Sequence, residues 1–142
     1  MAQHMQREEW QAFLSEGTRT AKLATTRKNG RPHVVPVWFV LDGDDVVLTT
    51  HTTTVKGKAL QRDGYVSLCV DDERPPFAFV LVEGRAEVSE DLDELLRWAT
   101  VIAGRYMGEK LAQEYGERNA VEGELLIRVH PERVVAMRNM AE

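Results

Sequence analysis

The chain has 142 residues, of which 43% are hydrophobic, so it is long enough for one compact domain and too short for two. Its 18 basic and 23 acidic residues give a net charge of −5, which argues against non-specific nucleic-acid binding as the main activity. The single cysteine, Cys69, excludes an internal disulfide, and no apolar run approaches the ~20 residues of a membrane-spanning helix.

The N-terminal segment lacks the basic-then-apolar order of a signal peptide, so we expect a cytoplasmic location and no membrane partner. Residues 1–5 are set aside as a cloning remnant or a disordered N-terminus, which leaves 6–142 as a single domain. The first predicted element is a short amphipathic helix from Arg7 to Glu16, which ends at Gly17. Its apolar residues at helical spacing are Trp10, Phe13 and Leu14.

Two strands joined by a tight turn are predicted next. Residues 18–26 alternate between two faces, and the following Lys28-Asn29-Gly30 contains the Asn-Gly pair typical of hairpins. The partner strand, 31–41, is apolar on both faces, as expected where one face lines a core and the other meets a second subunit. Pro36 within it has no backbone N–H, so we expect the sheet to be interrupted or bulged there.

The middle of the chain continues the pattern of strands and short helices. Asp42-Gly43 predicts a turn into a strand over 45–50, which a helix over 54–62 follows. Residues 65–70 and 77–88 then read as two long strands.

The last third of the chain is predicted to hold two helices and two strands. Ser89 is expected to cap a helix with carboxylates in its first turn, and a shorter helix covers 109–118. Strands over 122–129 and 133–137 are separated by Pro131. Six or seven antiparallel strands with helices between them predict an α+β Greek-key barrel. The predicted buried stripe of the first helix is Leu92, Leu95, Leu96, Ala99, Ile102, Ala103 and Tyr106.

One segment carries chemistry. The strand over 45–50 ends in the hydroxyls of Thr49 and Thr50, and the next helix begins with Thr54 and Lys56. Hydroxyls and backbone amides beside a lysine at a helix N-terminus suit a phosphate attached to a flat ring. Taken alone, a lysine such as Lys56 is usually a solvated helix charge, and Thr54 is an ordinary N-cap.

Several motifs along residues 6–138, each weak alone, occur in a specific order and spacing. They are Leu23-Ala24-Thr25-Thr26, Asn29-Gly30-Arg31-Pro32, Leu48-Thr49-Thr50, Lys56-Gly57-Lys58-Ala59-Leu60 and Phe79-Val80-Leu81-Val82-Glu83-Gly84. In this order the chain resembles the pyridoxamine 5′-phosphate oxidase-like split β-barrel superfamily, and within it the actinobacterial branch that uses the deazaflavin coenzyme F420. The resemblance implies an antiparallel split barrel with flanking helices. It also implies a homodimer with two cofactor grooves, each built from both chains.

The resemblance also implies residue roles. Lys56 matches the lysine that contacts the cofactor phosphate, and the strand end matches residues at the phosphate and ribityl chain. The backbone of 35–37 matches the strand that reads the ring edge, with His33 at its entry, and a basic cluster including Lys58 is placed to meet the coenzyme's glutamate tail. Two aromatics match those that the partner chain contributes. The implied cofactor-binding residues are His33, Val35, Pro36, Val37, Thr49, Thr50, Thr54, Lys56, Lys58, Phe77 and Phe79.

The implied activity is that of an F420H2-dependent reductase, which transfers a hydride to a conjugated, electron-poor small molecule and needs no catalytic residue of the protein. An FMN-dependent oxidase of the pyridoxamine phosphate kind is the first alternative, although residues 133–138 lack that family's Arg-x-His motif. A non-catalytic flavin, deazaflavin or haem binder is the second, with His33 or His51 as haem ligand. The histidines have no metal spacing, so no metal site is expected.

Overall fold

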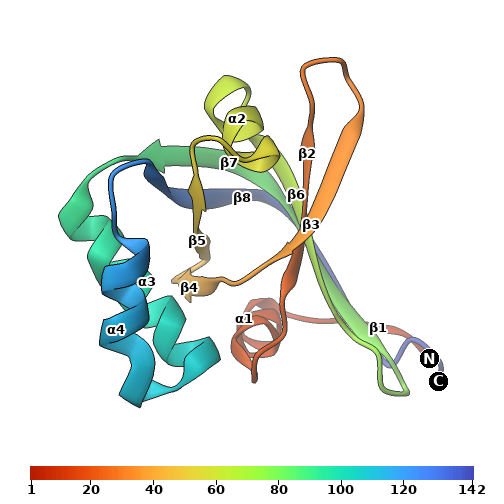
Figure 1. Ribbon diagram of the computed structural model, residues 1–142. Coiled ribbons are helices and arrows are strands. Elements are labelled where there is room, and N and C mark those ends of the chain that lie inside the picture. Colours follow the sequence, from red (N-terminus) through yellow and green to blue (C-terminus); the bar gives the residue numbers. More distant parts are fainter.

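A computed structural model describes all residues, 1–142, as a mixed α+β fold with four helices and one antiparallel sheet of eight strands (Figure 1). The strand order is β3-β2-β6-β7-β8-β5-β4, with β1 added to β8, so the predicted α+β antiparallel barrel is confirmed. The elements are β1 (Gln3–His4), α1 (Arg7–Ser15), β2 (Ala21–Thr26), β3 (Pro32–Val37), β4 (Val40–Asp42), β5 (Asp45–His51), α2 (Val55–Arg62), β6 (Tyr65–Asp72), β7 (Ala78–Ser89), α3 (Leu92–Met107), α4 (Glu109–Asn119) and β8 (Glu124–Arg138).

The barrel is closed by the chain itself. Strands β3 and β4 stand at the two ends of the strand order, yet only Trp38 and Phe39 separate them in sequence. The prediction of one strand over 31–41 is therefore wrong, because two strands, β3 and β4, occupy this segment. The interruption expected at Pro36 falls at Trp38, because Pro36 is accommodated on an edge strand, where the missing N–H is tolerated. We call this two-residue break between β3 and β4 the seam.

At the N-terminus, Gln3 and His4 pair with Met137 and Arg138 of β8, so these two residues of the 1–5 segment are ordered by a backbone ladder. The helix predicted next is present as α1, and a capping box between Gln6 and Glu9 begins it. Its apolar face, including Trp10, is buried under the barrel, as the helical spacing predicted.

The two strands predicted around Pro131 are one continuous strand, β8. Gly84 of β7 pairs with Pro131 and Glu83 pairs with Arg133, so Glu132 is the extra residue of a bulge. Pro131 is tolerated because the bulge breaks the ladder at that point. The backbones approach so closely that a Cβ on Gly84 would lie 2.3 Å from the His130 carbonyl oxygen, which explains the glycine.

Helix α3 begins later than predicted. Ser89 is the last residue of β7, and the carboxylate of Asp91 caps the helix by accepting from the amides of Asp93 and Glu94. In the predicted stripe, Leu92 and Leu96 are exposed, because they face away from the sheet. The buried side chains of α3 are Leu95, Trp98, Ala99, Ile102 and Ala103, and the larger ones form a cluster with Val40, Val47 and Leu126 of the sheet.

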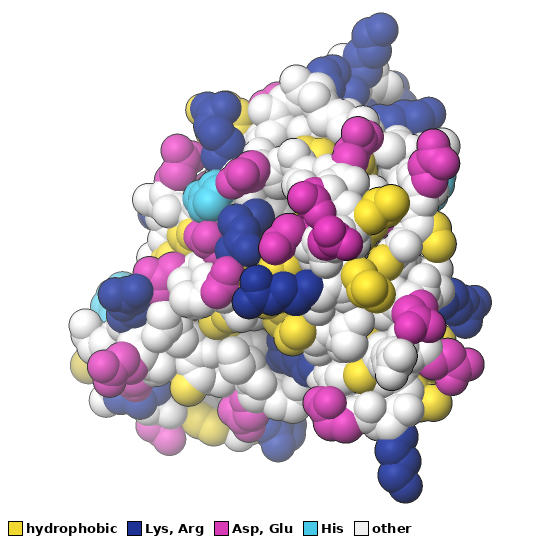
Figure 2. Space-filling view, turned by 90° about the vertical axis from the view of Figure 1, so that its left-hand side faces the viewer, with side chains coloured by type: hydrophobic (Ala, Val, Ile, Leu, Met, Phe, Trp, Pro, Cys, Tyr) yellow, Lys and Arg dark blue, Asp and Glu magenta, His cyan; other side chains and the backbone are white.

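The core has two parts, one inside the barrel and one between α3 and the sheet. The outer face of β6 stays partly open, so Cys69 is only partly buried. The face covered by α3 and α4 carries acidic, basic and apolar side chains intermixed (Figure 2), so it presents no strongly charged surface of one sign. No helix is both long and apolar enough to cross a bilayer.

Candidate functional site

A cleft of about 300 Å³ opens at the seam, between the end of β3, strand β5, the start of α2 and the face of α3. It brings together four of the predicted site residues, which come from three separate elements. Its lining is Pro36, Val37, Trp38, Thr49, Lys56, Ala99, Ile102, Ala103 and Asn119. Most of these side chains are apolar, and Lys56 is the charged one among them.

The turn from β5 into α2 fixes the polar side of this cleft. Thr54 is the N-cap of α2, and its hydroxyl accepts from the Gly57 amide at 3.0 Å. The same hydroxyl donates to the His51 carbonyl oxygen at 2.9 Å, so the Thr50 hydroxyl, 2.9 Å away, is the donor of that remaining pair. The role that the geometry gives Thr54 is that of the helix cap. Direct contact of Thr50 and Thr54 with a cofactor stays a prediction.

Helix α2 starts in close contact with the end of β5. A Cβ placed on Gly57 would lie 2.2 Å from the His51 carbonyl oxygen, and Gly57 is buried. Only a residue without a side chain allows this approach, which sets the first turn of α2, and with it Lys56, beside β5. The glycine at position 57 is therefore needed for Lys56 to lie beside β5.

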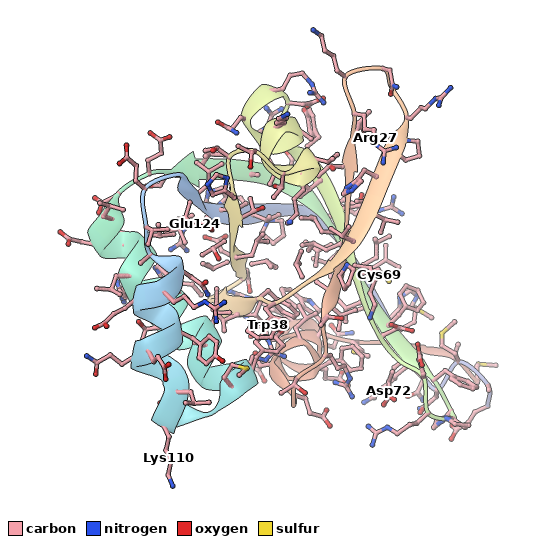
Figure 3. The ribbon with its side chains drawn as sticks, viewed as in Figure 1. Arg27, Trp38, Cys69, Asp72, Lys110 and Glu124 are labelled. Carbon is pink, nitrogen blue, oxygen red and sulfur yellow. The ribbon has the colours of Figure 1, made fainter.

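Lys56 is half-buried, and no carboxylate oxygen lies within 4.0 Å of its ammonium. Burial lowers the pKa of Lys56, and the more distant charge of Glu124 opposes that change. Burial also raises the pKa of Glu124, the first residue of β8 (Figure 3). A partly desolvated cation without an ion pair is stabilised when an anion binds beside it, so this end of the cleft suits an anionic group.

The opposite wall is aromatic and rigidly held. The indole of Trp38 stacks on the ring of Tyr106 with a centroid separation of 4.9 Å and an interplanar angle of 4°. The Tyr106 hydroxyl accepts from the Phe39 amide at 3.2 Å and donates to the Arg19 carbonyl at 2.8 Å. Burial raises the pKa of Tyr106, so the phenol stays protonated and keeps both bonds across the neutral pH range.

Arg105 holds the same segment from the other side. Its guanidinium donates to the Phe39 carbonyl at 2.7 Å, to the Leu14 carbonyl at 2.7 Å and to the Gly17 carbonyl at 3.0 Å. It therefore joins α3 to the seam and to the end of α1. Burial lowers the pKa of Arg105, but the group stays charged because guanidinium pKa values lie far above neutrality.

The remaining predicted residues lie elsewhere. His33 and Val35 point to the barrel side of β3, and the buried Nδ1 of His33 has no hydrogen-bond partner. Thr25, which pairs with His33 across β2 and β3, has an unpartnered hydroxyl as well. Lys58 is exposed on α2. None of these side chains lines the cleft within one chain.

Phe77 and Phe79 lie at the far end of the molecule, near the β6–β7 turn, where Figure 3 labels Asp72 well away from Trp38. Phe77 adopts a left-handed backbone conformation with φ of 65°, which is strained for an aromatic residue. It lines a second hollow of about 540 Å³ between α1 and this turn. Within one chain, this hollow is separate from the cleft.

Every arginine of this far hollow is ion-paired. Arg19 and Arg74 share the carboxylate of Asp72 at 3.3 and 3.0 Å, and Arg138 pairs with Glu9. Hydrogen bonds from Arg74 lower the pKa of Asp72 to about 2. The two hollows therefore differ in charge satisfaction, and only the cleft at the seam holds an unpaired cation.

Sequence reasoning missed several contributors to the cleft. Asn119, which lines the cleft, and Glu124, whose charge acts on Lys56, gave no local signal, because helices and strands carry such residues routinely on solvated faces. The small side chains Ala99 and Ala103 were identified as buried, but nothing local indicated that they form a ligand wall. Arg105 was not identified, and Tyr106 was predicted only as part of the buried stripe of α3, not as a support for the cleft wall.

The antiparallel sheet closed at a seam, with a lysine-bearing cleft beside it, places the chain in the class of split β-barrel proteins. The chain belongs to the pyridoxamine 5′-phosphate oxidase family, whose family model matches residues 6–138. It is 35% identical over 95 residues to an F420H(2)-dependent biliverdin reductase of Mycobacterium tuberculosis, a match that spans 67% of this chain and 68% of that protein.

Two solved structures support the same assignment. A conserved hypothetical protein from Mycobacterium tuberculosis superimposes with a TM-score of 0.83 at 26% identity, covering 97% of this chain and 89% of the other. An F420 reductase superimposes with a TM-score of 0.68 at 25% identity, covering 87% of this chain and 94% of the other. The resemblance inferred from the order of motifs is therefore confirmed.

Proposed function

We propose that this protein is an F420H2-dependent reductase that transfers a hydride to a conjugated, electron-poor small molecule. The observation that carries the proposal is the half-buried, unpaired ammonium of Lys56 facing an apolar wall across the cleft. An anionic cofactor with a flat ring satisfies both sides of this cleft at once. The relative named as an F420H(2)-dependent biliverdin reductase supports the choice of cofactor.

The residues of the cleft fit this cofactor in kind. Lys56 and the free first-turn amides of α2 would hold the phosphate, with Thr49 beside them. Because β3 is an edge strand, backbone groups of Val35 to Val37 are free to pair with the polar edge of the ring. The cleft of about 300 Å³ lies at the small end of ligand pockets, so the rest of the cofactor would extend along exposed β3.

When bound, the reduced deazaflavin supplies a hydride, and solvent supplies the proton that completes the two-electron reduction of the acceptor. The chain's own residues then have three tasks. Lys56 anchors the charged end, the β3 backbone orients the ring, and Trp38 with the α3 wall keeps water from the reacting atoms. No nucleophile or acid of the protein is required.

A second copy of the chain would complete the site. Val34, 63% exposed, and Pro36 project from the outer face of β3. On the same side of the sheet, beyond Lys22 of β2, half-buried Leu81 and Val135 form a second apolar area on β7 and β8. Soluble monomers rarely leave such a face open, and a two-fold dimer buries it. Within one chain, Phe77 and Phe79 lie too far from the cleft to contact a ligand there. In the dimer, these two residues of the partner would approach the cofactor instead.

A basic cluster lies above the cleft and would meet the carboxylates of the coenzyme's glutamate tail. Arg27, Lys28 and Arg31 are at the turn of the β2–β3 hairpin, which projects from the barrel (Figure 1), and Lys58 lies on α2. All four are exposed, and none has a carboxylate within ion-pair distance. In a chain of net charge −5, this local excess of positive charge favours an anionic ligand.

Two alternatives lead to different observations. An FMN-dependent oxidase would need a substrate phosphate site, and the Arg-x-His motif of that activity is missing from the end of β8. A haem binder would need a histidine in the cleft. Neither His33 nor His51 lines it, and His51 Nδ1 is already hydrogen-bonded to the Thr53 hydroxyl at 2.8 Å.

The test is a side-by-side titration of the purified protein with F420 and FMN, followed by the absorbance and fluorescence of each ring. We expect micromolar or tighter binding of F420 and much weaker binding of FMN, at a stated salt concentration because phosphate contacts are partly screened. Stoichiometric FMN that F420 cannot displace would refute the proposal.

A further inference from the structure

Trp38 is 41% exposed although one face of its indole is covered by Tyr106. The exposed part therefore belongs to the other face and the ring edges. Trp38 also lines the cleft, and its Nε1 donates to no acceptor of the protein. An aromatic face and an N–H donor are thus both available at the cleft to a ligand.

This position is unusually well fixed for a residue outside any strand. The neighbouring Phe39 is fully buried. Its amide donates to the Tyr106 hydroxyl, and its carbonyl oxygen accepts from the Arg105 guanidinium. Tyr106 is itself anchored through its hydroxyl, so the ring on which Trp38 stacks is held in place. A preorganised aromatic face loses little conformational entropy when a flat molecule binds to it.

We infer that the Trp38–Tyr106 stack is a platform that selects acceptors by planarity, with Trp38 contacting the acceptor and Tyr106 positioning Trp38. This inference rests on the proposed function for its catalytic consequence. The free indole face favours extended, fused conjugated rings, and the free Nε1–H favours a carbonyl oxygen at their edge. The acceptor class is accordingly planar conjugated carbonyl compounds, such as fused quinones, in preference to small puckered enones.

The experiment compares a fused quinone, menadione, with a puckered enone, cyclohex-2-en-1-one, at saturating F420H2. For Trp38→Leu we expect kcat/KM for menadione to fall about 3- to 10-fold, the range that loss of an aromatic stack predicts. The value for cyclohexenone should fall by clearly less, because leucine keeps an apolar wall against water and a small puckered ring gains little from an aromatic face. Trp38→Phe, which keeps a ring, should recover most of the menadione rate.

Two further variants separate contact from positioning. Tyr106→Leu removes the supporting ring and should lose the same preference for menadione. Tyr106→Phe keeps the ring but loses the hydroxyl bonds to Phe39 and Arg19, so it should retain the preference in part. Tyr65→Leu is the matched control, because Tyr65 is an exposed aromatic residue under the guanidinium of Arg85, on β6 and outside the cleft. It should leave both acceptors unchanged.

Calorimetric binding of menadione to the protein without turnover gives a readout that does not depend on F420 activity. Weaker binding to Trp38→Leu and unchanged binding to Tyr65→Leu would support the platform even if F420 fails to bind. Equal losses for both acceptors, or a loss of F420 affinity with the acceptor preference intact, would overturn it. Failure of the proposed function would appear instead as absent F420 binding by the unsubstituted protein.

Discussion

The cleft at the seam and the hollow beneath the β6–β7 turn differ in how their charges are satisfied. The hollow is larger, about 540 Å³ against about 300 Å³, but each arginine in it already pairs with a carboxylate. The cleft holds Lys56, which is half-buried and unpaired. A paired cation has little left to offer a ligand, whereas an unpaired, partly desolvated one is stabilised by an anion. Charge satisfaction therefore distinguishes the two hollows better than size does.

The largest effect is expected at the unpaired cation itself. In Lys56→Ala, loss of a charge-assisted contact should weaken F420 binding by about 1.5–3 kcal/mol, or about 10- to 150-fold. The rate at saturating cofactor should survive, because a phosphate anchor mainly contributes uniform binding. Fluorescence titration measures the affinity and steady-state kinetics measures the rate.

Lys110→Ala is the matched control for this variant, since Lys110 is an exposed lysine on α4 with no ion pair (Figure 3). It should leave the affinity unchanged, and both variants should melt within a degree or two of the unsubstituted protein. Wild-type affinity in Lys56→Ala would identify Lys56 as a solvated charge and remove the contrast between the two hollows.

The second prediction concerns the contact that places Lys56. In Gly57→Ala the new Cβ must displace the His51 carbonyl, so we expect a loss of about 1–3 kcal/mol in the free energy of unfolding. Gly104→Ala is the matched control. There the Cβ meets only the end of the Glu109 side chain, and the gain in helix propensity should offset the contact. Equal denaturation midpoints for the two variants would contradict the close approach.

The third prediction distinguishes a cap from a ligand contact. Thr54→Ala should cost about 0.5–2 kcal/mol in the free energy of unfolding, because the Gly57 amide and the buried Thr50 hydroxyl lose their partner. Thr54→Ser should restore most of it. Affinity for F420, measured under the same conditions, should fall less than in Lys56→Ala. A larger loss of affinity than of stability would assign Thr54 directly to the cofactor.

The smallest effect is expected in the hollow with satisfied charges. Because the pKa of Asp72 is lowered to about 2 in the folded protein, its ionised form contributes stability above about pH 4. That contribution is lost as the pH falls from about 4 towards about 2. The difference in melting temperature between wild type and Asp72→Asn should therefore shrink over this range. At pH 7, F420 affinity should be the same in both, and a change would bring the hollow into the site.

Local signals in the sequence predicted those elements whose determinants are neighbours in the chain. The Asn29-Gly30 turn, the α1 periodicity and the Thr54 start of α2 each depend on a few consecutive residues. Four residues of the cleft were named from motif order. Lys56 lies in the first turn of α2, as predicted, because a strand that leads straight into a helix leaves little freedom in between, and its contact with a cofactor stays a prediction.

Contacts between distant segments were beyond such reasoning. The continuity of β8 through Pro131 depends on Gly84 across the sheet, and pattern alone predicts a break there. The stack between Trp38 and Tyr106 joins residues far apart in sequence, and neither residue carries a local signal for it. The wall of the cleft was missed because packing of α3 on the barrel creates it.

The seam has a mechanical consequence. No ladder of hydrogen bonds joins β3 to β4, so two backbone residues and the side chains that grip them complete the circumference of the barrel. Neither Trp38 nor Phe39 belongs to a strand pair, so rotation about their backbone torsions would change the width of the cleft at the seam without breaking any strand pairing. Arg105 of α3, which bonds the Phe39 carbonyl, therefore restrains the width of this cleft, while the sheet fixes where the cleft lies. A substitution at Arg105 should make the cleft more compliant and leave the barrel intact.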